Sequence, residues 1–302
     1  MGMDRRGGTG KALMVGYRSE SYHAHVYVLR FLSLFYDRPD HFLVLKATGT
    51  SLVEKLHIRN WPTHCFDVTG SSDLTMTDIT LDNSAGNAPN AMSSGLPAAH
   101  NSDGFDVSTC TNMVIKDSTV INQDDCVAIT SGNNITVSNL VCDGGHGLSI
   151  GSVGGKSNNN VSNVLFTDSS VKNSQNGARI KTNFNTTGTV TNVEWRNIHV
   201  SNISIYGIDV QQDYLNGGPT GKTQTLWVLH EIYCVIGIPS NGVILTNITM
   251  QNIFGTAQRV AQNYFILCGD GSCSDFNFNN ILITGGRNDS CNFTPSGNFR
   301  CV

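Results

Sequence analysis

The fold is decided by Val114-Ile-Lys-Asp117-Ser-Thr-Val120 and by its repeat, Ile135-Thr-Val-Ser-Asn139-Leu-Val141. In both copies apolar and polar residues alternate, a turn-prone Asp or Asn follows, and a second apolar run begins. Alternation with a period of two indicates strands and not helices. Further copies of the pattern lie at 74–81, 164–171, 193–200 and 243–250. We therefore expect a chain of short strands with a bend inside each copy.

The central Asp or Asn marks the register of each copy. The intervals are 22 residues from Asp117 to Asn139, 29 to Asp168, 29 to Asn197 and 50 to Asn247. A repeat of this length, made of short β-branched runs, is typical of a solenoid. Each repeat has room for two or three strands, so we predict an all-β chain folded as a right-handed parallel β-helix. The alternative is an antiparallel sandwich, whose strands do not normally repeat side-chain identity at a fixed coil length.

Composition favours the same class of fold and argues against several functions. Only 14% of the residues are charged and 31 are glycine, which suits strands and turns better than long helices. The net charge of -4 gives no overall electrostatic footprint for nucleic acid. An apolar stretch at 26–36 is too short for a membrane span, and Arg30 interrupts it. We expect a monomer with one elongated core that binds neither nucleic acid nor membrane.

Two stretches do not follow the repeat. Residues 11–37 are rich in Tyr, His, Arg and Leu, and residues 223–238 lack the Asn, Gly and Thr that surround them. The second stretch coincides with the 50-residue interval, which is about 21 residues longer than the intervals before it. We therefore predict one parallel β-helix domain over residues 1–302, with 11–37 and 223–238 as foreign insertions.

Nine cysteines leave at least one thiol unpaired. Three local pairs are candidate disulfides: Cys126 with Cys142, Cys268 with Cys273, and Cys291 with Cys301. We expect Cys65 and Cys110 to be buried as small hydrophobic residues, while Cys234 lies in the second foreign stretch. Weak support for a secreted glycoprotein comes from seven Asn-x-Ser/Thr sequons, at Asn134, Asn160, Asn185, Asn202, Asn247, Asn288 and Asn292.

Acidic side chains and one histidine recur at the spacing of the repeat. Asp103 precedes Asp125 by 22 residues, and Asp124 precedes His146 by 22. If one coil takes about 22 residues, these groups stack on rungs about 4.8 Å apart. Three close carboxylates repel each other, so at least one pKa should rise, as a general acid requires. We predict an acid/base site; turn-forming and coil-capping carboxylates are the alternative.

Two further expectations concern this site. In a flat strand Asp124 and Asp125 would point to opposite faces, so both reach one cleft only if the chain bends there. The nine histidines are scattered, and no Cys-x-x-Cys or His-x-x-x-His spacing occurs, so we expect no metal and no cofactor.

Four motifs follow each other along the chain: Asn101-Ser-Asp-Gly104, Asn122-Gln-Asp-Asp-Cys126, Gly144-Gly-His-Gly-Leu-Ser-Ile-Gly-Ser152 and Arg179-Ile-Lys181. Together they resemble glycoside hydrolase family 28 and, within it, the fungal endopolygalacturonases. The resemblance covers about 52–221 and 241–301. It implies a right-handed parallel β-helix, secretion, and hydrolysis of the α-1,4 bonds between galacturonate residues of pectin.

The resemblance also implies catalytic roles. Asp124 is the general acid, while Asp103 and Asp125 hold and activate the attacking water. This is an inverting mechanism, in which the carboxyl groups lie about 6.5–9.5 Å apart. His146 has an auxiliary role, because it could orient a carboxylate or hydrogen-bond the substrate.

The same resemblance assigns substrate binding to Arg179, Lys181 and Tyr214. Arg179 and Lys181 are two residues apart and point from one strand face, where they suit the carboxylate of galacturonate. A solvated charged face is the alternative for this pair, and ordinary aromatic packing is the alternative for Tyr214. An exo-acting or rhamnogalacturonan-cleaving relative, and a β-helix that only binds polysaccharide, also stay open.

The chain departs from the family in two respects. We find no signal peptide in Met1-Gly-Met-Asp-Arg-Arg6, which Gly and Thr follow, and no N-terminal cap. The foreign stretches 11–37 and 223–238 interrupt the resemblance. We therefore hypothesise that they are retained introns or gene-model errors, with loop insertions as the simpler explanation. Removal of the second stretch would also remove Cys234 and leave eight cysteines.

Overall fold

The computed structural model describes residues 13–15, 23–28, 40–215, 218–219 and 237–301. Within them the chain forms one short 3-10 helix, η1 (Ser84–Gly86), and strands in two sheets. The first sheet contains β1 (Leu13–Val15), β2 (His23–Val28), β3 (His41–Thr48), β6 (His64–Thr69), β9 (Phe105–Ser108), β11 (Val127–Ile129), β13 (Leu148–Val153), β15 (Asn176–Asn183), β17 (Tyr206–Leu215), β18 (Gly218–Pro219), β20 (Gln262–Leu267) and β22 (Ser290–Cys291). The second contains β4 (Ser51–Glu54), β5 (His57–Arg59), β7 (Leu74–Thr77), β8 (Thr80–Asp82), β10 (Cys110–Asn122), β12 (Gly132–Gly144), β14 (Asn160–Lys172), β16 (Gly188–Ile203), β19 (Val243–Ala257), β21 (Cys273–Thr284) and β23 (Ser296–Gly297).

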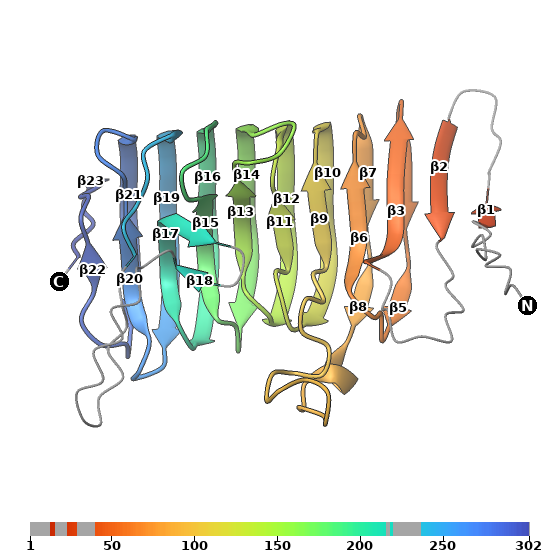
Figure 1. Cartoon of the computed structure of the whole chain (residues 1–302), viewed down its shortest axis with the longest axis horizontal. Helices are drawn as coiled ribbons and strands as arrows, with labels where there is room; N and C mark the ends of the chain where they lie inside the picture. The colour runs from red at the N-terminus through yellow and green to blue at the C-terminus, as the bar shows by residue number, and fades with distance from the viewer. Residues whose placement is uncertain (1–12, 16–22, 29–39, 216–217, 220–236, 302) are drawn as a thin grey trace, which may run out of the picture.

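Successive coils lie side by side along the long axis of the molecule (Figure 1). From β3 to β22 the neighbours of the first sheet are parallel, in the order β3-β6-β9-β11-β13-β15-β17-β20-β22. The second sheet runs β4-β7-β10-β12-β14-β16-β19-β21-β23, again with parallel neighbours. A chain that returns to the same sheet after each coil is a parallel β-helix. The predicted fold is confirmed, and the antiparallel sandwich is wrong.

A residue in the left-handed conformation turns each long strand around a corner of the coil. In β10 this residue is Asp117, with a φ of 50°, and in β12 it is Asn139, with a φ of 53°. The burial pattern changes phase there, because Ile115 and Ser118, three residues apart, are both buried. Asn and Asp adopt left-handed φ more readily than other non-glycine residues. The corner therefore explains the Asp or Asn in each repeat.

Hydrogen bonds join the corner side chains from coil to coil. Nδ2 of Asn139 donates to Oδ1 of Asp117 at 2.7 Å. Equivalent bonds of 2.7–3.0 Å join Asn197 to Asp168, Asn280 to Asn252, Asn134 to Asn112, and Asn192 to Asn163. These ladders hold neighbouring coils in register, so residues one coil apart come to lie next to each other.

The predicted register is wrong at Asn247. Its Nδ2 donates to Asn192, 55 residues earlier, at 2.7 Å, and Asn252 is the residue that donates to Asn197, at 2.9 Å. Both corners of this coil carry Asn after an alternating run, so the sequence pattern does not distinguish them. The coil spans 55 residues against 29 for the one before it, an excess of 26 and not of about 21.

Apolar side chains of successive coils stack in the interior. Phe166 and Trp195, on adjacent coils, stack with ring centroids 5.1 Å apart, and Phe66 and Phe105 do so at 5.3 Å. Burial of one such side chain contributes about 1.5–3 kcal/mol. The buried side chains form one continuous cluster, as predicted.

The cysteine predictions are confirmed within the described residues. Disulfides join Cys126 to Cys142, Cys268 to Cys273 and Cys291 to Cys301. Cys65 and Cys110 are free thiols, and both are buried. Cys234 lies outside the residues that the structure describes.

The foreign stretches are described only in part. Residues 13–15 and 23–28 form β1 and β2, which are antiparallel, and β2 pairs with β3 in the same sense. The remainder of 11–37 and residues 223–236 lie outside the described part of the chain, so the insertion hypothesis stays a prediction. In the described part, no helix has the length and apolar character needed to cross a bilayer.

Substitution of Asn139 tests the corner ladder. Asn139→Gly keeps the left-handed φ and loses only the hydrogen bond, so we expect a loss of about 1 kcal/mol in unfolding free energy. Asn139→Ala also places a strained residue at φ 53°, which should cost about 1 kcal/mol more. Urea unfolding of both variants, with Ser138→Ala as the control, measures the difference. Equal stability of the Ala variant and the parent chain would contradict the ladder.

Candidate active site

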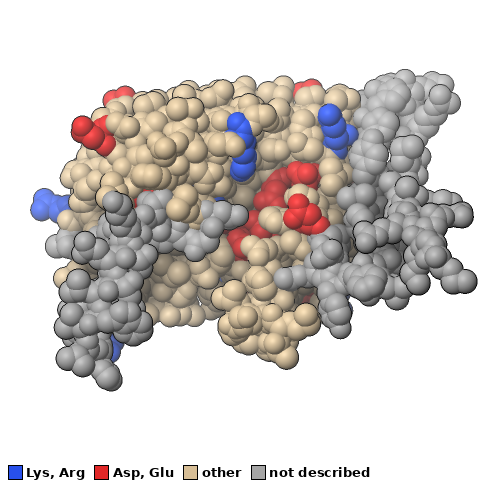
Figure 2. Space-filling view, in the orientation of Figure 1, with Lys and Arg blue, Asp and Glu red and all other residues tan. Residues whose placement is uncertain are grey.

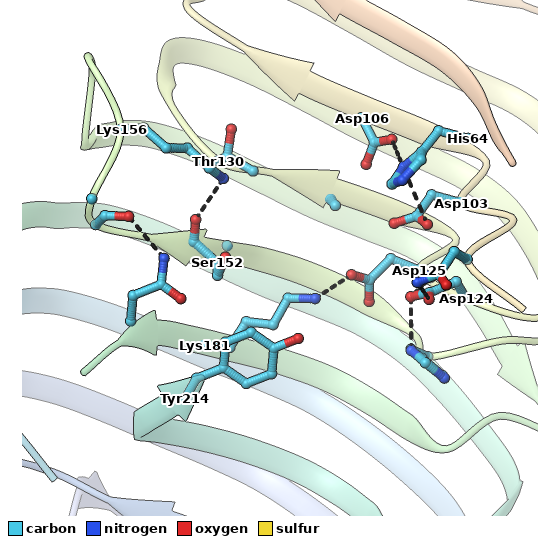
Figure 3. A pocket seen from close by; sticks show the side chains of 17 residues that line it. His64, Asp103, Asp106, Asp124, Asp125, Thr130, Ser152, Lys156, Lys181 and Tyr214 are labelled. Atoms are coloured by element: carbon cyan, nitrogen blue, oxygen red, sulfur yellow. Dashed lines mark hydrogen bonds and ion pairs between the residues drawn. The ribbon is translucent and has the colours of Figure 1, made fainter. Parts of the chain in front are cut away.

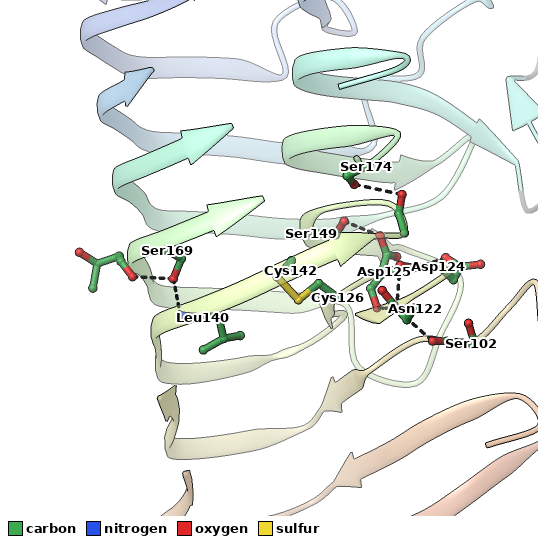
Figure 4. Close-up of a disulfide and its surroundings, with 12 residues drawn as sticks. Ser102, Asn122, Asp124, Asp125, Cys126, Leu140, Cys142, Ser149, Ser169 and Ser174 are labelled. Carbon is green, nitrogen blue, oxygen red and sulfur yellow. Dashed lines mark hydrogen bonds between the residues drawn. A yellow bond between two sulfur atoms is a disulfide. The ribbon is translucent and has the colours of Figure 1, made fainter. Parts of the chain in front are cut away.

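The chain bends between β10 and β11, where Asp124 and Asp125 lie. Nδ2 of Asn122, at the end of β10, is 2.9 Å from each of the main-chain oxygens of Ser102, Asp124 and Asp125 (Figure 4). Asn122 is buried, so these bonds are shielded from water. The bend lets the carboxylates of Asp124 and Asp125 line one cleft, as we expected from the sequence.

Ser102 and Gln123 tie this bend to the preceding coil. Oγ of Ser102 donates to Oε1 of Gln123 at 2.7 Å, and the main-chain N–H of Gln123 donates to that Oγ at 3.0 Å. Nε2 of Gln123 donates to the main-chain oxygen of Asn83 at 2.9 Å. Because Ser102 adjoins Asp103 and Gln123 adjoins Asp124, these bonds fix the two carboxylates relative to each other.

Asp125 lies at the back of the site and is only 1% exposed. Its Oδ1 accepts a hydrogen bond from Oγ of Ser149 at 2.7 Å, and its Oδ2 accepts one from Nζ of Lys181 (Figure 3). Nη1 of Arg179 lies 3.9 Å from Oδ1. A buried carboxylate is tolerated only when it is paired and hydrogen-bonded. Ser149 and Lys181 meet that requirement.

Asp124 is joined to His146 on the next coil. Its Oδ1 lies 2.8 Å from Nδ1 of His146, and the main-chain N–H of His146 donates to the main-chain oxygen of Asp124 at 2.8 Å. Burial opposes ionisation of Asp124. The hydrogen bond from His146 and the charges of His146 and Lys181 outweigh burial and hold the pKa of Asp124 below its usual range.

Asp103 lies one coil earlier and is buried. Burial raises its pKa well above the usual range, and the negative charges of Asp106, Asp124 and Asp125 act in the same direction. The rise in pKa that three close carboxylates predicted is therefore found at Asp103. The residue expected to be the acid, Asp124, has a lowered pKa in the free protein.

Arg179 and Lys181 point from one face of β15, as predicted, because both approach Asp125 and Tyr214. Cζ of Arg179 lies 5.6 Å from the centre of the Tyr214 ring, and Nζ of Lys181 lies 5.4 Å from it. Lys181 and Tyr214 line the cleft, but Arg179 lies behind them, where its Nε donates to Oδ2 of Asp209 at 3.0 Å. Burial raises the pKa of Asp209 to about 6, against the opposing charge of Arg179.

These side chains meet in one cleft with a volume of about 670 Å³. Acidic side chains gather in a hollow in the middle of this face (Figure 2). Within the cleft the carboxylates lie toward one end and Lys156 and Tyr214 toward the other, and Lys181 extends from that end to its bond with Asp125 (Figure 3). The lining includes six of the seven predicted site residues: Asp103, Asp124, Asp125, His146, Lys181 and Tyr214.

Sequence reasoning missed several residues of the site. Nδ1 of His64 lies 2.6 Å from Oδ2 of Asp106 and 3.3 Å from Oδ1 of Asp103. Ser149 and Asp209 hold Asp125 and Arg179. The repeat did not predict that His64 belongs to the site. The segment between β6 and β9 contains η1 and its loop, so it does not have the length of the other coils.

Two groups in the described residues have donor atoms within 4.8 Å of one another, as a metal ion needs: Asp124 with Asp125 and His146, and His41 with His64 and Asp106. In the first group Nζ of Lys181 already neutralises Asp125 and would repel a cation. The residues of these two groups do not follow a recognisable metal-ligand spacing in the sequence, so the sequence alone did not reveal either group. The expectation of a site without a metal stays a prediction.

Comparison with known proteins identifies the family. The sequence model for glycosyl hydrolases family 28 matches residues 36–299. The chain belongs to this family. Its members among the curated proteins include a probable endopolygalacturonase D of Emericella nidulans, 57% identical over 86% of this chain and 48% of that protein. A polygalacturonase of Fusarium fujikuroi is 56% identical over 85% of this chain and 65% of that protein.

The family member described here is shorter than these relatives, and spans about half the length of several of them. Among solved structures, endopolygalacturonase I of Stereum purpureum, in complex with two galacturonate molecules, has a TM-score of 0.66 and 28% identity. That match covers 83% of this chain and 68% of the other. An endo-xylogalacturonan hydrolase of Aspergillus tubingensis has a TM-score of 0.59 and 27% identity, over 82% and 64% of the two chains.

A double-mutant cycle on Asp125 and Lys181 tests the buried pair. Lys181→Met leaves the Asp125 carboxylate buried without its cation, which should destabilise the fold by about 3–5 kcal/mol. Adding Asp125→Asn removes the stranded charge, so the double variant should be more stable than Lys181→Met alone. Urea unfolding at pH 7 measures the three variants. If the loss of unfolding free energy in the double variant equals the sum of the losses in Lys181→Met and Asp125→Asn, the two side chains do not stabilise each other.

Proposed function

We propose that the protein hydrolyses α-1,4-D-galacturonosidic bonds of pectate from within the polymer, with inversion at the anomeric carbon. One observation carries the proposal: the cleft holds four carboxylates and two histidines toward one end, and Tyr214 toward the other, from which Lys181 reaches Asp125. Membership of family 28 and relatives named endopolygalacturonases support it. The arrangement also favours a catalyst over a β-helix that only binds polysaccharide, because binding alone needs no set of buried acids.

In this proposal Asp124 and His146 together form the general acid. The leaving oxygen must receive a proton as the glycosidic bond breaks. The 2.8 Å contact between Oδ1 of Asp124 and Nδ1 of His146 allows a proton to pass to Asp124 as negative charge develops on the leaving oxygen. The lowered pKa of Asp124 belongs to the free protein. A galacturonate carboxylate nearby would raise it, because like charges favour the protonated form.

Asp103 and Asp125 then hold and deprotonate the attacking water. Asp125 is fixed by Ser149 and Lys181 and so can accept a hydrogen bond from water without moving. Asp103 lines the same cleft beside Asp125, so its carboxylate can share the attacking water and take its proton. The two residues supply the second carboxylate function that an inverting hydrolase needs.

The basic end of the cleft binds the substrate. Lys181 and Lys156 line it, and ammonium groups form charge-assisted hydrogen bonds with the carboxylate of each galacturonate ring. The ring of Tyr214 offers an apolar face to the sugar. Arg179 acts from behind, because its pairing with Asp209 and its position near Tyr214 hold this wall of the cleft in place.

Hydrolysis by Asp124→Asn tests the catalytic assignment. The amide cannot pass on a proton, so kcat on polygalacturonate should fall about 10²–10⁴-fold with little change in KM. Asp270→Asn, at an exposed position on a loop between β20 and β21, is the matched control and should retain full activity. Unchanged kcat in purified, folded Asp124→Asn would overturn the assignment.

The products of the parent chain test the class of reaction. Oligomers of several lengths should appear first, and proton NMR in the first minutes should show the β-anomer at the new reducing end. Monomer from the outset would point to an exo-acting relative. An initial α-anomer would contradict inversion.

We further propose that the protein is secreted as a monomer, and that residues 11–37 and 223–238 are foreign to the repeat. Three disulfides suit an oxidising compartment, and the 26-residue excess of one coil supports the second insertion. Deletion of 223–238 should leave the chain folded and active on polygalacturonate. A spliced transcript that retains this segment, with loss of folding on its deletion, would contradict the proposal.

A further inference from the structure

His64 lies at the acidic end of the cleft and lines it, yet the proposed reaction leaves it without a role. It begins β6, and its Nδ1 points between two carboxylates of the next coil. Oδ2 of Asp106 is 2.6 Å away, and Oδ1 of Asp103 is 3.3 Å away (Figure 3). Each of the two outer carboxylates of the site, Asp103 and Asp124, therefore has a histidine Nδ1 beside it.

The surroundings of His64 favour its charged form. Burial alone would lower its pKa, but the hydrogen bond to Asp106 and the charge of Asp106 outweigh burial, so the pKa of His64 is raised. The other groups that act on His64 or share its cluster come from every element around it: Asp40 and His41 at β3, Asp67 on β6, Asp103 before β9, and Asp124 on the bend. Because carboxylates outnumber imidazoles in this set, the groups around His64 favour its positively charged form.

Asp103 needs a nearby cation if it is to act as a base. Its Oδ1 is buried and accepts no hydrogen bond from the described residues, and three carboxylates disfavour its ionisation. The other cation at hand is Lys181, but its Nζ is bonded to Asp125. His64 is therefore the group that can offset the buried charge of Asp103 at short range.

We propose that His64 is a positioning residue that Asp106 holds in its protonated form, and that the imidazolium favours ionisation of Asp103, the base of the reaction, against the burial that opposes it. The inference rests on the proposed function, because it assigns Asp103 the role of base. His64 does not touch the substrate's reacting atoms in this scheme. It acts through Asp103, whereas Asp106 holds the imidazole in place and also adds a negative charge that acts directly on Asp103.

The two partners should have opposite effects on Asp103. His64→Gln keeps a hydrogen-bond donor but removes the positive charge, so Asp103 should ionise at a higher pH. Asp106→Asn removes a negative charge that acts directly on Asp103 and leaves Nδ1–H of His64 to pair with Asp103, whose own carboxylate then stabilises the imidazolium. Asp103 should therefore ionise at a lower pH. A charge within about 4–6 Å moves a pKa by about one unit or more. A purely structural role of His64, such as its packing against His41, predicts no such opposition.

The test is a carboxyl carbon-13 NMR titration of the full chain labelled at aspartate, with the Asp103 signal identified by its loss in Asp103→Asn. The midpoint of that signal should rise by about one pH unit in His64→Gln and fall by about one in Asp106→Asn. His57→Gln, at an exposed position on β5, is the matched control and should leave the midpoint unchanged. If one variant fails to fold, the sign of the other still decides. An unmoved midpoint, or shifts of the same sign, overturns the inference.

Activity gives a second and separate readout. The acidic limb of the kcat profile on polygalacturonate should move with the NMR midpoint, upward in His64→Gln and downward in Asp106→Asn. At the pH of the parent chain's midpoint, His64→Gln should retain only about a tenth of its own plateau kcat. A chain that cleaves no polygalacturonate would refute the proposed function and leave the NMR result standing. A limb that stays fixed while the midpoint moves would show that Asp103 is not the base.

Discussion

The register between neighbouring coils is the constraint on which the rest of the structure depends. It is set at the corners, where Asp and Asn with left-handed φ turn the strands and bond to the equivalent residue one coil away. A fixed register converts spacing along the chain into proximity in space. Asp103, Asp124 and His146 lie on three successive coils and meet because each precedes a strand of the same sheet. A slip of one residue in any coil would turn these side chains away from one another.

The site depends on the compensation of buried charge. Asp125 is held by Lys181 and Ser149, Asp124 by His146, and Arg179 by Asp209. Each carboxylate therefore has its own surroundings, and the pKa of Asp103 rises while that of Asp124 falls. In the free protein this order is the reverse of the one that Asp124 as acid and Asp103 as base need. The scheme therefore requires the substrate's carboxylate to raise the pKa of Asp124, and the charge of His64 to favour ionisation of Asp103.

The sequence predicted the parallel β-helix well, because period-two alternation and recurring Asp or Asn report directly on strands and corners. It also predicted the bend at Asp124 and Asp125 and the three local disulfides, which depend on short-range geometry. It failed at Asn247, because both corners of that coil carry the same pattern and only the pairing distinguishes them. It placed Arg179 with Lys181 on one face but could not foresee Asp209, which draws Arg179 behind the cleft. His64 and Asp106 were missed because an irregular loop separates their strands in sequence.

We propose that coil register assembles one cleft, whose acidic end cleaves a galacturonate chain and whose basic end binds it. A crystal structure of Asp124→Asn with a bound galacturonate oligomer tests it most directly. We expect an oligomer lying along the cleft, with a glycosidic oxygen within about 2.6–3.2 Å of residue 124 and a sugar carboxylate on Nζ of Lys181. An oligomer bound outside the cleft, or one whose glycosidic oxygens all lie far from residue 124, would contradict it.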